Sequence, residues 1–171
     1  MTTLAGRVTP AVTVFILAIL AVLPWGLPAH ARFVLPFLPV VAIHYWSSRH
    51  LERLSAWVPF AAGLVVDVLT NGPLGYWPLI YLGAMMLGAD AQRMPGTGPA
   101  ARWALFLAAL MGLVIAAWGV ASLYHLEFSD WRPFAWALWI GALSYPLVAL
   151  GLRALDPEPQ RASNDRLVRG V

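Results

Sequence analysis

The amino-acid sequence predicts an all-α integral membrane protein, built as a compact bundle of six transmembrane helices. Hydrophobic residues make up 60% of its 171 residues and charged residues only 11%, whereas a soluble domain carries about 25% charged residues. The apolar runs have helical length and lack the period-two alternation of a lipid-facing barrel. We therefore expect a membrane domain over 1–152 and a polar cytoplasmic tail without fixed structure over 153–171.

Six apolar segments follow one another along the chain, and we expect each to form a helix. The hydrocarbon core needs about 20 helical residues, which the first, fifth and sixth segments supply. The third supplies them only if it begins at Leu51, in an amphipathic stretch. The second and fourth are short, and Pro36 and Pro39 favour an irregular second segment. Four spans and one re-entrant hairpin are the alternative. The six segments are 9–29, 33–46, 51–70, 76–89, 102–124 and 133–152.

The arginines predict the orientation of the bundle. All eleven basic residues are Arg. If both termini are cytoplasmic, Arg32 and Arg132 lie outside and the other nine lie inside, as the positive-inside rule requires. Six tryptophans also fall at predicted span ends, the depth that indole rings prefer. They are Trp25, Trp46, Trp57, Trp77, Trp103 and Trp131.

Composition also excludes several functions. The net charge of +3 and the pI near 9.8 come from arginines scattered between apolar runs, and no basic face with interleaved aromatic residues is present. We therefore expect no nucleic-acid partner. The absence of cysteine excludes disulfides, thiolate metal sites and cysteine nucleophiles.

The N-terminal segment has two interpretations. Arg7, the apolar run over 12–23 and the small residues Ala29 and Ala31 resemble a cleavable signal peptide. The other interpretation is a retained first span, which Pro24 and Trp25 favour because they are typical of a span end. Cleavage leaves the orientation of the other five spans unchanged.

The most informative motif is an acid before a turn. Asp67 lies inside an apolar run, about one helical turn before Gly72, Pro73, Leu74 and Gly75. In the structural interpretation, the carboxylate accepts hydrogen bonds from turn amides and stabilises the hairpin. We expect the two glycines to adopt backbone angles that other residues resist, and Pro73 to begin the next helix. In the functional interpretation, Asp67 contacts a partner protein or forms a proton or ion site.

Other polar groups do not form a predicted catalytic or metal site. His44, Arg49, His50, Glu52 and Arg53 are expected to form a solvated, lipid-facing connector, because competing arginines disfavour a metal. His125, Glu127, Asp130 and Arg132 are expected to belong to an ordinary charged loop, although paired carboxylates can serve acid–base chemistry. We therefore predict no enzyme, no catalytic residue, no metal and no cofactor.

Small residues recur at every fourth position of the fifth segment. Ala104, Ala108, Gly112 and Ala116 form a stripe that allows close approach of another helix. Packing within the protein is the default interpretation, and packing against a partner is the alternative. Possible counterparts are Ala84 and Gly88 in the fourth segment, and Ala137 and Gly141 in the sixth.

Residues 36–90 resemble the MreD family of bacterial rod-shape-determining membrane proteins. The resemblance is carried by the proline-broken span ending in His44, Tyr45 and Trp46, by residues 57–60, and by residues 63–67 ending in Asp67. Its strongest part is the turn from Gly72 to Gly75. The resemblance implies a fold similar to the substrate-binding subunits of vitamin-uptake transporters, in six helices.

The resemblance also implies a function. MreD-like proteins are non-enzymatic scaffolds of the elongation machinery in the inner membrane, where they bind MreC and support lateral peptidoglycan synthesis and rod shape. The wider complex contains MreB, RodA and a class B penicillin-binding transpeptidase, and membrane lipid surrounds it. The motif residues Asp67, Gly72, Pro73, Leu74 and Gly75 become scaffold or partner-contact candidates. The alternative function is a small-molecule (vitamin-like) binding subunit of an uptake transporter.

Overall fold

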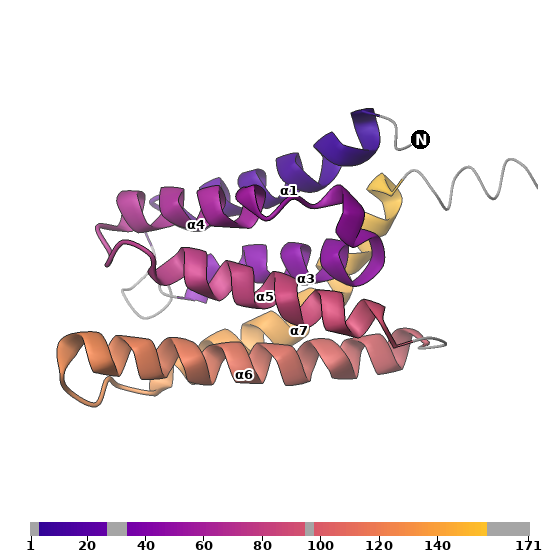
Figure 1. Cartoon of the computed structure of the whole chain (residues 1–171). Helices are drawn as coiled ribbons and strands as arrows, with labels where there is room; N and C mark the ends of the chain where they lie inside the picture. Colours follow the sequence, from indigo (N-terminus) through magenta and orange to yellow (C-terminus); the bar gives the residue numbers. More distant parts are fainter. Residues whose placement is uncertain (1–3, 27–33, 95–97, 157–171) are drawn as a thin grey trace, which may run out of the picture.

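The computed structural model describes residues 4–26, 34–94 and 98–156, which form a bundle of six α-helices (Figure 1). No strand occurs among these residues, so the all-α prediction is confirmed. Two short 3-10 helices flank the second helix of the bundle. The helices are α1 (Leu4–Val22), η1 (Leu35–Phe37), α3 (Leu38–His50), η2 (Leu51–Arg53), α4 (Trp57–Thr70), α5 (Tyr76–Gln92), α6 (Pro99–His125) and α7 (Arg132–Leu155).

The six helices follow the six predicted segments in order, with differences at their ends. The second segment is irregular as predicted, since Pro36 lies in η1 before α3 begins. Helix α4 begins at Trp57, because the amphipathic stretch forms η2 and a turn. Helix α7 continues to Leu155, and Asp156 is buried, so the fold extends past the predicted boundary at 152. Residues 157–171 of the predicted tail, with Ala29 and Ala31, lie outside the described residues.

Helix α3 is the centre of the bundle. It contacts α1, α5 and α7, and all its residues from Pro39 to Ser47 are buried. The indole Nε1 of Trp46 donates a hydrogen bond of 3.0 Å to Thr13 Oγ1, which joins α3 to α1. Trp46 and Trp77 are core residues, buried between the helices. Helix α1 packs on α3 and α4, so the first segment is part of the folded bundle.

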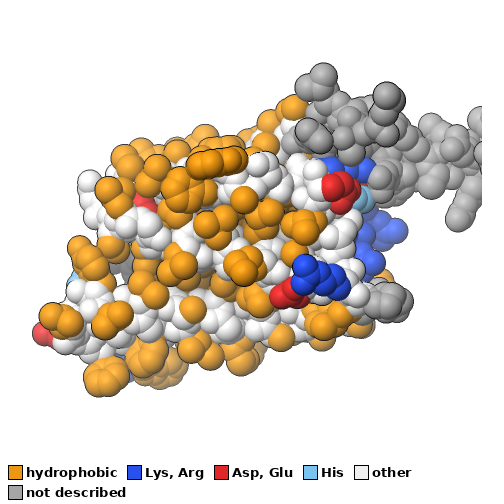
Figure 2. Space-filling model, viewed as in Figure 1, with side chains coloured by type: hydrophobic (Ala, Val, Ile, Leu, Met, Phe, Trp, Pro, Cys, Tyr) orange, Lys and Arg blue, Asp and Glu red, His pale blue; other side chains and the backbone are white. Residues whose placement is uncertain are grey.

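The outer surface of the bundle is largely apolar, as Figure 2 shows for one face. Among the described residues, α6 and α7 are the helices long and apolar enough to cross a membrane. Only 33% and 22% of their apolar windows are buried, so neither resembles the core helix of a soluble protein. Large apolar side chains such as Ile16, Leu64 and Met86 face outward on α1, α4 and α5. Soluble monomers rarely expose apolar surface on this scale.

Charged side chains gather at one end of the bundle (Figure 2). The helices alternate in direction along the chain (Figure 1), which brings the C-terminal ends of α3, α5 and α7 together with the N-terminal end of α6. These ends carry Arg49, Arg93, Arg102 and Arg153, whereas Arg132 begins α7 at the opposite end. We call the end that carries Arg49, Arg93, Arg102 and Arg153 the arginine-rich end. Four of these five arginines thus lie at one end of the described bundle.

Candidate functional site

The α4–α5 hairpin lies at the end of the bundle opposite the arginine-rich end. Its turn begins with a cap at the C-terminus of α4. Asn71 adopts the left-handed conformation at φ 52°, and its N–H donates to the Val68 carbonyl. The N–H of Gly72 donates to the Asp67 carbonyl over 3.0 Å. This pair of bonds is a Schellman motif, in which asparagine replaces the usual glycine. The left-handed residue is therefore Asn71, and the prediction that Gly72 is needed for an unusual backbone angle is wrong.

The side chain of Asp67 connects α4 to the start of α5. Its Oδ2 accepts a hydrogen bond of 2.7 Å from the N–H of Gly75, and its Oδ1 accepts one of 3.1 Å from the N–H of Trp77. Asp67 is 0% exposed. These are the first amides of a helix, which have no intrahelical acceptor. The carboxylate thus caps α5 from the neighbouring helix, which is the hydrogen bonding that the structural interpretation of Asp67 predicts.

The other turn residues have separate roles. Gly75 has a φ of 98°, which favours glycine, and this confirms the backbone prediction at that position. Helix α5 begins at Tyr76, so Pro73 lies before the helix and does not form its first turn as predicted. The Pro73 carbonyl instead accepts the N–H of Tyr76 over 3.1 Å and closes a turn. Leu74 is 72% exposed at the tip of the hairpin.

A close helix contact lies one turn below Asp67 and was not predicted as a feature of the hairpin. A Cβ added to Gly63 would overlap the backbone of Pro78, at its N and Cα atoms. Pro78 is the third residue of α5, where a backbone N–H would have no partner within the helix. A glycine facing a proline therefore brings the two backbones together without losing a hydrogen bond.

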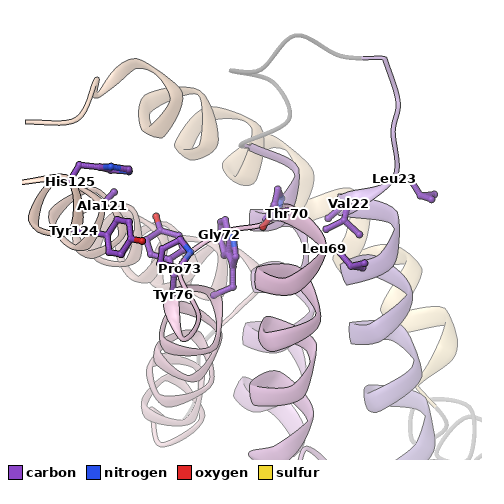
Figure 3. Close-up of a pocket in the computed structure, with 13 residues that line it drawn as sticks. Val22, Leu23, Leu69, Thr70, Gly72, Pro73, Tyr76, Ala121, Tyr124 and His125 are labelled. Atoms are coloured by element: carbon purple, nitrogen blue, oxygen red, sulfur yellow. The ribbon is translucent and has the colours of Figure 1, made fainter.

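A cavity of about 470 Å³ lies beside the hairpin. The labelled lining residues in Figure 3 come from the end of α1, the α4–α5 hairpin and the end of α6, and Pro36 of η1 also lines the cavity. The walls are mostly apolar, with polar groups from Thr70, Tyr124 and His125. The hydroxyl of Tyr76 is used elsewhere, since it donates to the Ala117 carbonyl over 3.2 Å. Gly72 and Pro73 are the motif residues that line this cavity.

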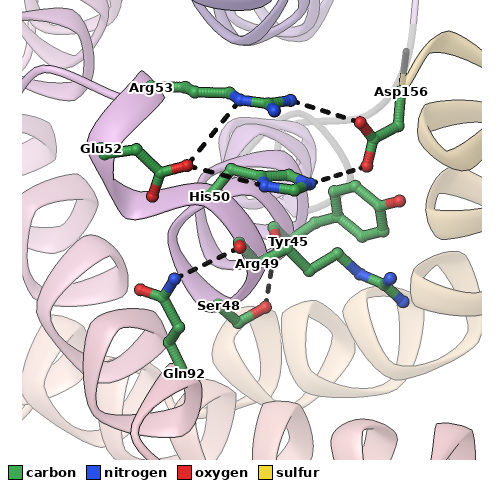
Figure 4. Close-up of polar contacts among 8 residues, drawn as sticks. All are labelled: Tyr45, Ser48, Arg49, His50, Glu52, Arg53, Gln92 and Asp156. Carbon is green, nitrogen blue, oxygen red and sulfur yellow. Dashed lines mark hydrogen bonds and ion pairs between the residues drawn. The ribbon is translucent and has the colours of Figure 1, made fainter. Parts of the chain in front are cut away.

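The arginine-rich end contains a buried ion cluster, shown in Figure 4. Asp156, after the end of α7, places Oδ2 2.8 Å from His50 Nε2 and Oδ1 3.4 Å from Arg53 Nη1. The side chains of Asp156 and Arg53 are only 3% and 7% exposed, whereas Glu52, 3.8 Å from Arg53 Nε, is 56% exposed. The prediction of a solvated connector is therefore wrong for His50 and Arg53, because the predicted tail contributes an acid that buries them.

The small-residue stripe of α6 faces outward. Ala104, Ala108, Gly112 and Ala116 are all exposed, so the default interpretation of packing within the protein is wrong for them. The opposite face of α6, which includes Phe106 and Leu110, packs on the bundle. The four proposed counterparts are buried in other contacts: a Cβ on Gly88 would overlap Ser47 Oγ, and one on Gly141 would lie 2.8 Å from Leu110 Cδ2.

The remaining polar groups form no candidate reactive site. His125, Glu127 and Arg132 are exposed in the α6–α7 region, and Asp130 Oδ1 accepts the N–H of Arg132 over 3.1 Å at the start of α7. Within 4–26, 34–94 and 98–156, no group of three His, Asp or Glu side chains is placed to hold a metal ion. The strongest candidate site of the described chain is therefore the hairpin with its adjoining cavity.

Comparison of the chain with models of protein families, with curated proteins and with solved structures finds no match.

Proposed function

We propose that this chain is a multi-pass protein of the bacterial inner membrane, with both termini in the cytoplasm, and a non-enzymatic scaffold of cell-wall elongation that binds MreC. The observation that carries the proposal is the use of Asp67. Both carboxylate oxygens accept backbone amides inside the protein, and the residue has no exposed surface. An acid used in this way stabilises the hairpin through charge-assisted hydrogen bonds, as a structural role requires. The residues with the strongest resemblance to the MreD family surround it.

The apolar surface and the arginine distribution support a membrane location for this scaffold. Helices α6 and α7 meet the length and hydropathy of a membrane span, and α1 and α4 carry shorter apolar runs. The arginines at the ends of α3, α5 and α7 and at the start of α6 favour a cytoplasmic position for that end. The hairpin tip with exposed Leu74 then faces the periplasm, where it is accessible to a partner such as MreC.

Co-purification tests the proposal directly. The tagged full-length chain should retain MreC when native membranes are solubilised in a mild detergent, and depletion of the chain should make rod-shaped cells round. Retention of rod shape and of wall-precursor incorporation after depletion would refute it. A second tagged inner-membrane protein of similar size controls for non-specific capture.

The cavity beside the hairpin favours a second candidate, a small-molecule binding subunit of an uptake transporter. Its volume of about 470 Å³ lies within the range of about 300–1,000 Å³ typical of ligand pockets, and its apolar walls carry a few polar groups. A vitamin-like ligand should then raise the melting temperature of the purified chain, and the same pull-down should retain an ATPase module in place of MreC.

A further inference from the structure

A hollow lined by tryptophan side chains lies on the outward face of α7, near the start of that helix. It has a volume of about 430 Å³. Trp131, Trp136 and Trp139 line it, and each of these residues is more than half exposed. The opposite face of α7, which includes Phe134 and Tyr145, is buried in the bundle. The hollow therefore lies on the outer surface of the described bundle.

A single arginine gives one end of this hollow a positive charge. Arg132, Trp136 and Trp139 follow one another at spacings of four and three, so they share one face of α7. The side chain of Arg132 is exposed and forms no ion pair with another described residue. The nearby acid Asp130 binds the backbone instead, since its Oδ1 accepts the N–H of Arg132 over 3.1 Å. None of the residues that line the hollow is acidic.

The hollow has the depth of part of one membrane leaflet. Helix α7 is long and apolar enough to cross a membrane. Trp139 lies seven residues after Arg132, which is about 10 Å along a helix that rises about 1.5 Å per residue. One leaflet contributes about half of a hydrocarbon core of about 30 Å. A lipid whose phosphate lies at Arg132 can therefore place an acyl chain along both indole rings below it.

The lining residues favour a phospholipid over the other possible occupants. Membrane helices approach one another closely where small residues line the contact, whereas this face presents three indoles. A soluble anion would meet one guanidinium above apolar walls that offer it no further charge. A phospholipid matches both parts of the hollow, because arginine offers several donors to a phosphate and indole rings pack on the chain near the membrane surface.

We propose that this face of α7 binds an anionic phospholipid, with Arg132 contacting the phosphate and with Trp136 and Trp139 packing on an acyl chain. The lipid belongs to the leaflet at the end opposite the arginine-rich end. A zwitterionic headgroup carries its own cation beside the phosphate, so Arg132 should favour an anionic headgroup. The inference depends on the membrane location proposed above and not on MreC. A chain that fails to bind MreC can still retain the lipid, whereas release of the chain from membranes by alkaline carbonate would refute the membrane location itself.

Native mass spectrometry of the purified full-length chain in a neutral detergent measures the bound lipid. The wild-type chain should retain phosphatidylglycerol in preference to phosphatidylcholine. Arg132→Gln should weaken retention of phosphatidylglycerol about tenfold, the loss expected for one charged hydrogen bond, and should abolish the preference. Arg153→Gln is the matched control, because Arg153 is also exposed and lies near the other end of the same helix.

Replacement of the indoles tests the contact with the acyl chain. The double variant Trp136→Ala and Trp139→Ala should retain severalfold less of both lipids, because packing on the chain does not depend on the headgroup. Trp57→Ala is the control, since Trp57 is 76% exposed on α4 and does not line the hollow. All three tryptophans are exposed, so thermal melting should show that the variants remain folded.

Crosslinking locates the lipid on the protein. Phosphatidylglycerol with a photoactivatable diazirine on its acyl chain should label α7 between Arg132 and Leu155 in the wild-type chain. Labelling confined to other helices would overturn the proposal, as would equal retention of the two lipids by the wild-type chain. Equal weakening by Arg153→Gln and Arg132→Gln would also overturn it. A lipid-free dimer that the double tryptophan variant disrupts would identify a second copy of the chain as the occupant instead.

Discussion

Asp67 Oδ2 and the backbone N–H of Gly75 are joined by a hydrogen bond of 2.7 Å across the α4–α5 turn, eight residues apart in the chain. The same carboxylate accepts Trp77 N–H through its other oxygen. Asp67 therefore takes part in the end of α4 through its backbone carbonyl and in the start of α5 through its side chain. Because a buried amide without an acceptor costs free energy, the hairpin depends on both oxygens of Asp67.

The first prediction concerns the two acceptors of Asp67. Asp67→Asn keeps one oxygen but directs an NH₂ group at a backbone donor, so we expect a loss of about 1–2 kcal/mol in the free energy of unfolding. Asp67→Leu removes both acceptors and should cost more. Thermal unfolding of the purified variants gives the order wild type, Asn, Leu. Equal stability of the Asn and Leu variants would show that the carboxylate does not act through these bonds.

The second prediction concerns the contact between Gly63 and Pro78. Gly63→Ala places a Cβ in the backbone of α5, and overpacking of this kind costs about 1–3 kcal/mol. Gly112→Ala is the matched control, because no atom lies within 4 Å of its added Cβ and alanine favours a helix. Denaturation should show that Gly63→Ala is destabilised and Gly112→Ala is not. Similar behaviour of the two variants would contradict the close approach of α4 and α5.

The third prediction separates two glycines that look alike in the motif. Gly75→Ala forces a side chain into a positive φ and should lower stability by about 1 kcal/mol. Gly72→Ala should be tolerated better, because its added Cβ meets Thr70 Oγ1 at 3.3 Å and the Asp67 carbonyl oxygen at 4.0 Å. A melting comparison of the two variants is sufficient. A larger loss of stability in Gly72→Ala than in Gly75→Ala would contradict the assignment of the glycine-requiring backbone angle to Gly75.

Some features could be predicted because their signals are local. The helices follow apolar runs, and the hairpin follows from an acid, two glycines and a proline within nine residues. The side of α6 that packs against the bundle could not be predicted, because this helix is apolar on most sides. Four-residue spacing shows that Ala104 and Ala108 share a face, but it does not distinguish the face that packs from the one that is exposed.

Pairing between distant segments was missed for a related reason. Asp156 meets His50 across 106 positions, and no periodicity links them. Its proline-flanked, polar surroundings are typical of a solvated tail, and only the path of α7 returns it to α3. His44 was predicted to belong to the same solvated connector, and this is wrong because the side chain is 1% exposed and packs on Phe106 and Tyr145 from two other helices.

The fourth prediction tests the ion cluster. Asp156→Ala removes the buried acid that contacts both His50 and Arg53, which should cost about 3 kcal/mol. Glu52→Ala is the control, because that side chain is 56% exposed and a surface pair contributes less than about 1 kcal/mol. Chemical denaturation at constant pH and salt measures both. Equal losses would mean that Asp156 is no more important than a surface acid.

The fifth prediction concerns the exposed stripe of α6 and depends on the proposed scaffold function. If a partner helix packs there, Ala108→Leu and Ala116→Leu should block its close approach while leaving the isolated chain as stable as before, because both positions face outward. MreC retained in the pull-down should fall severalfold at equal expression. Leu143→Phe, at an exposed site on α7, is the control for added bulk. If Ala108→Leu and Ala116→Leu both retain as much MreC as the wild-type chain does, the partner binds to another face.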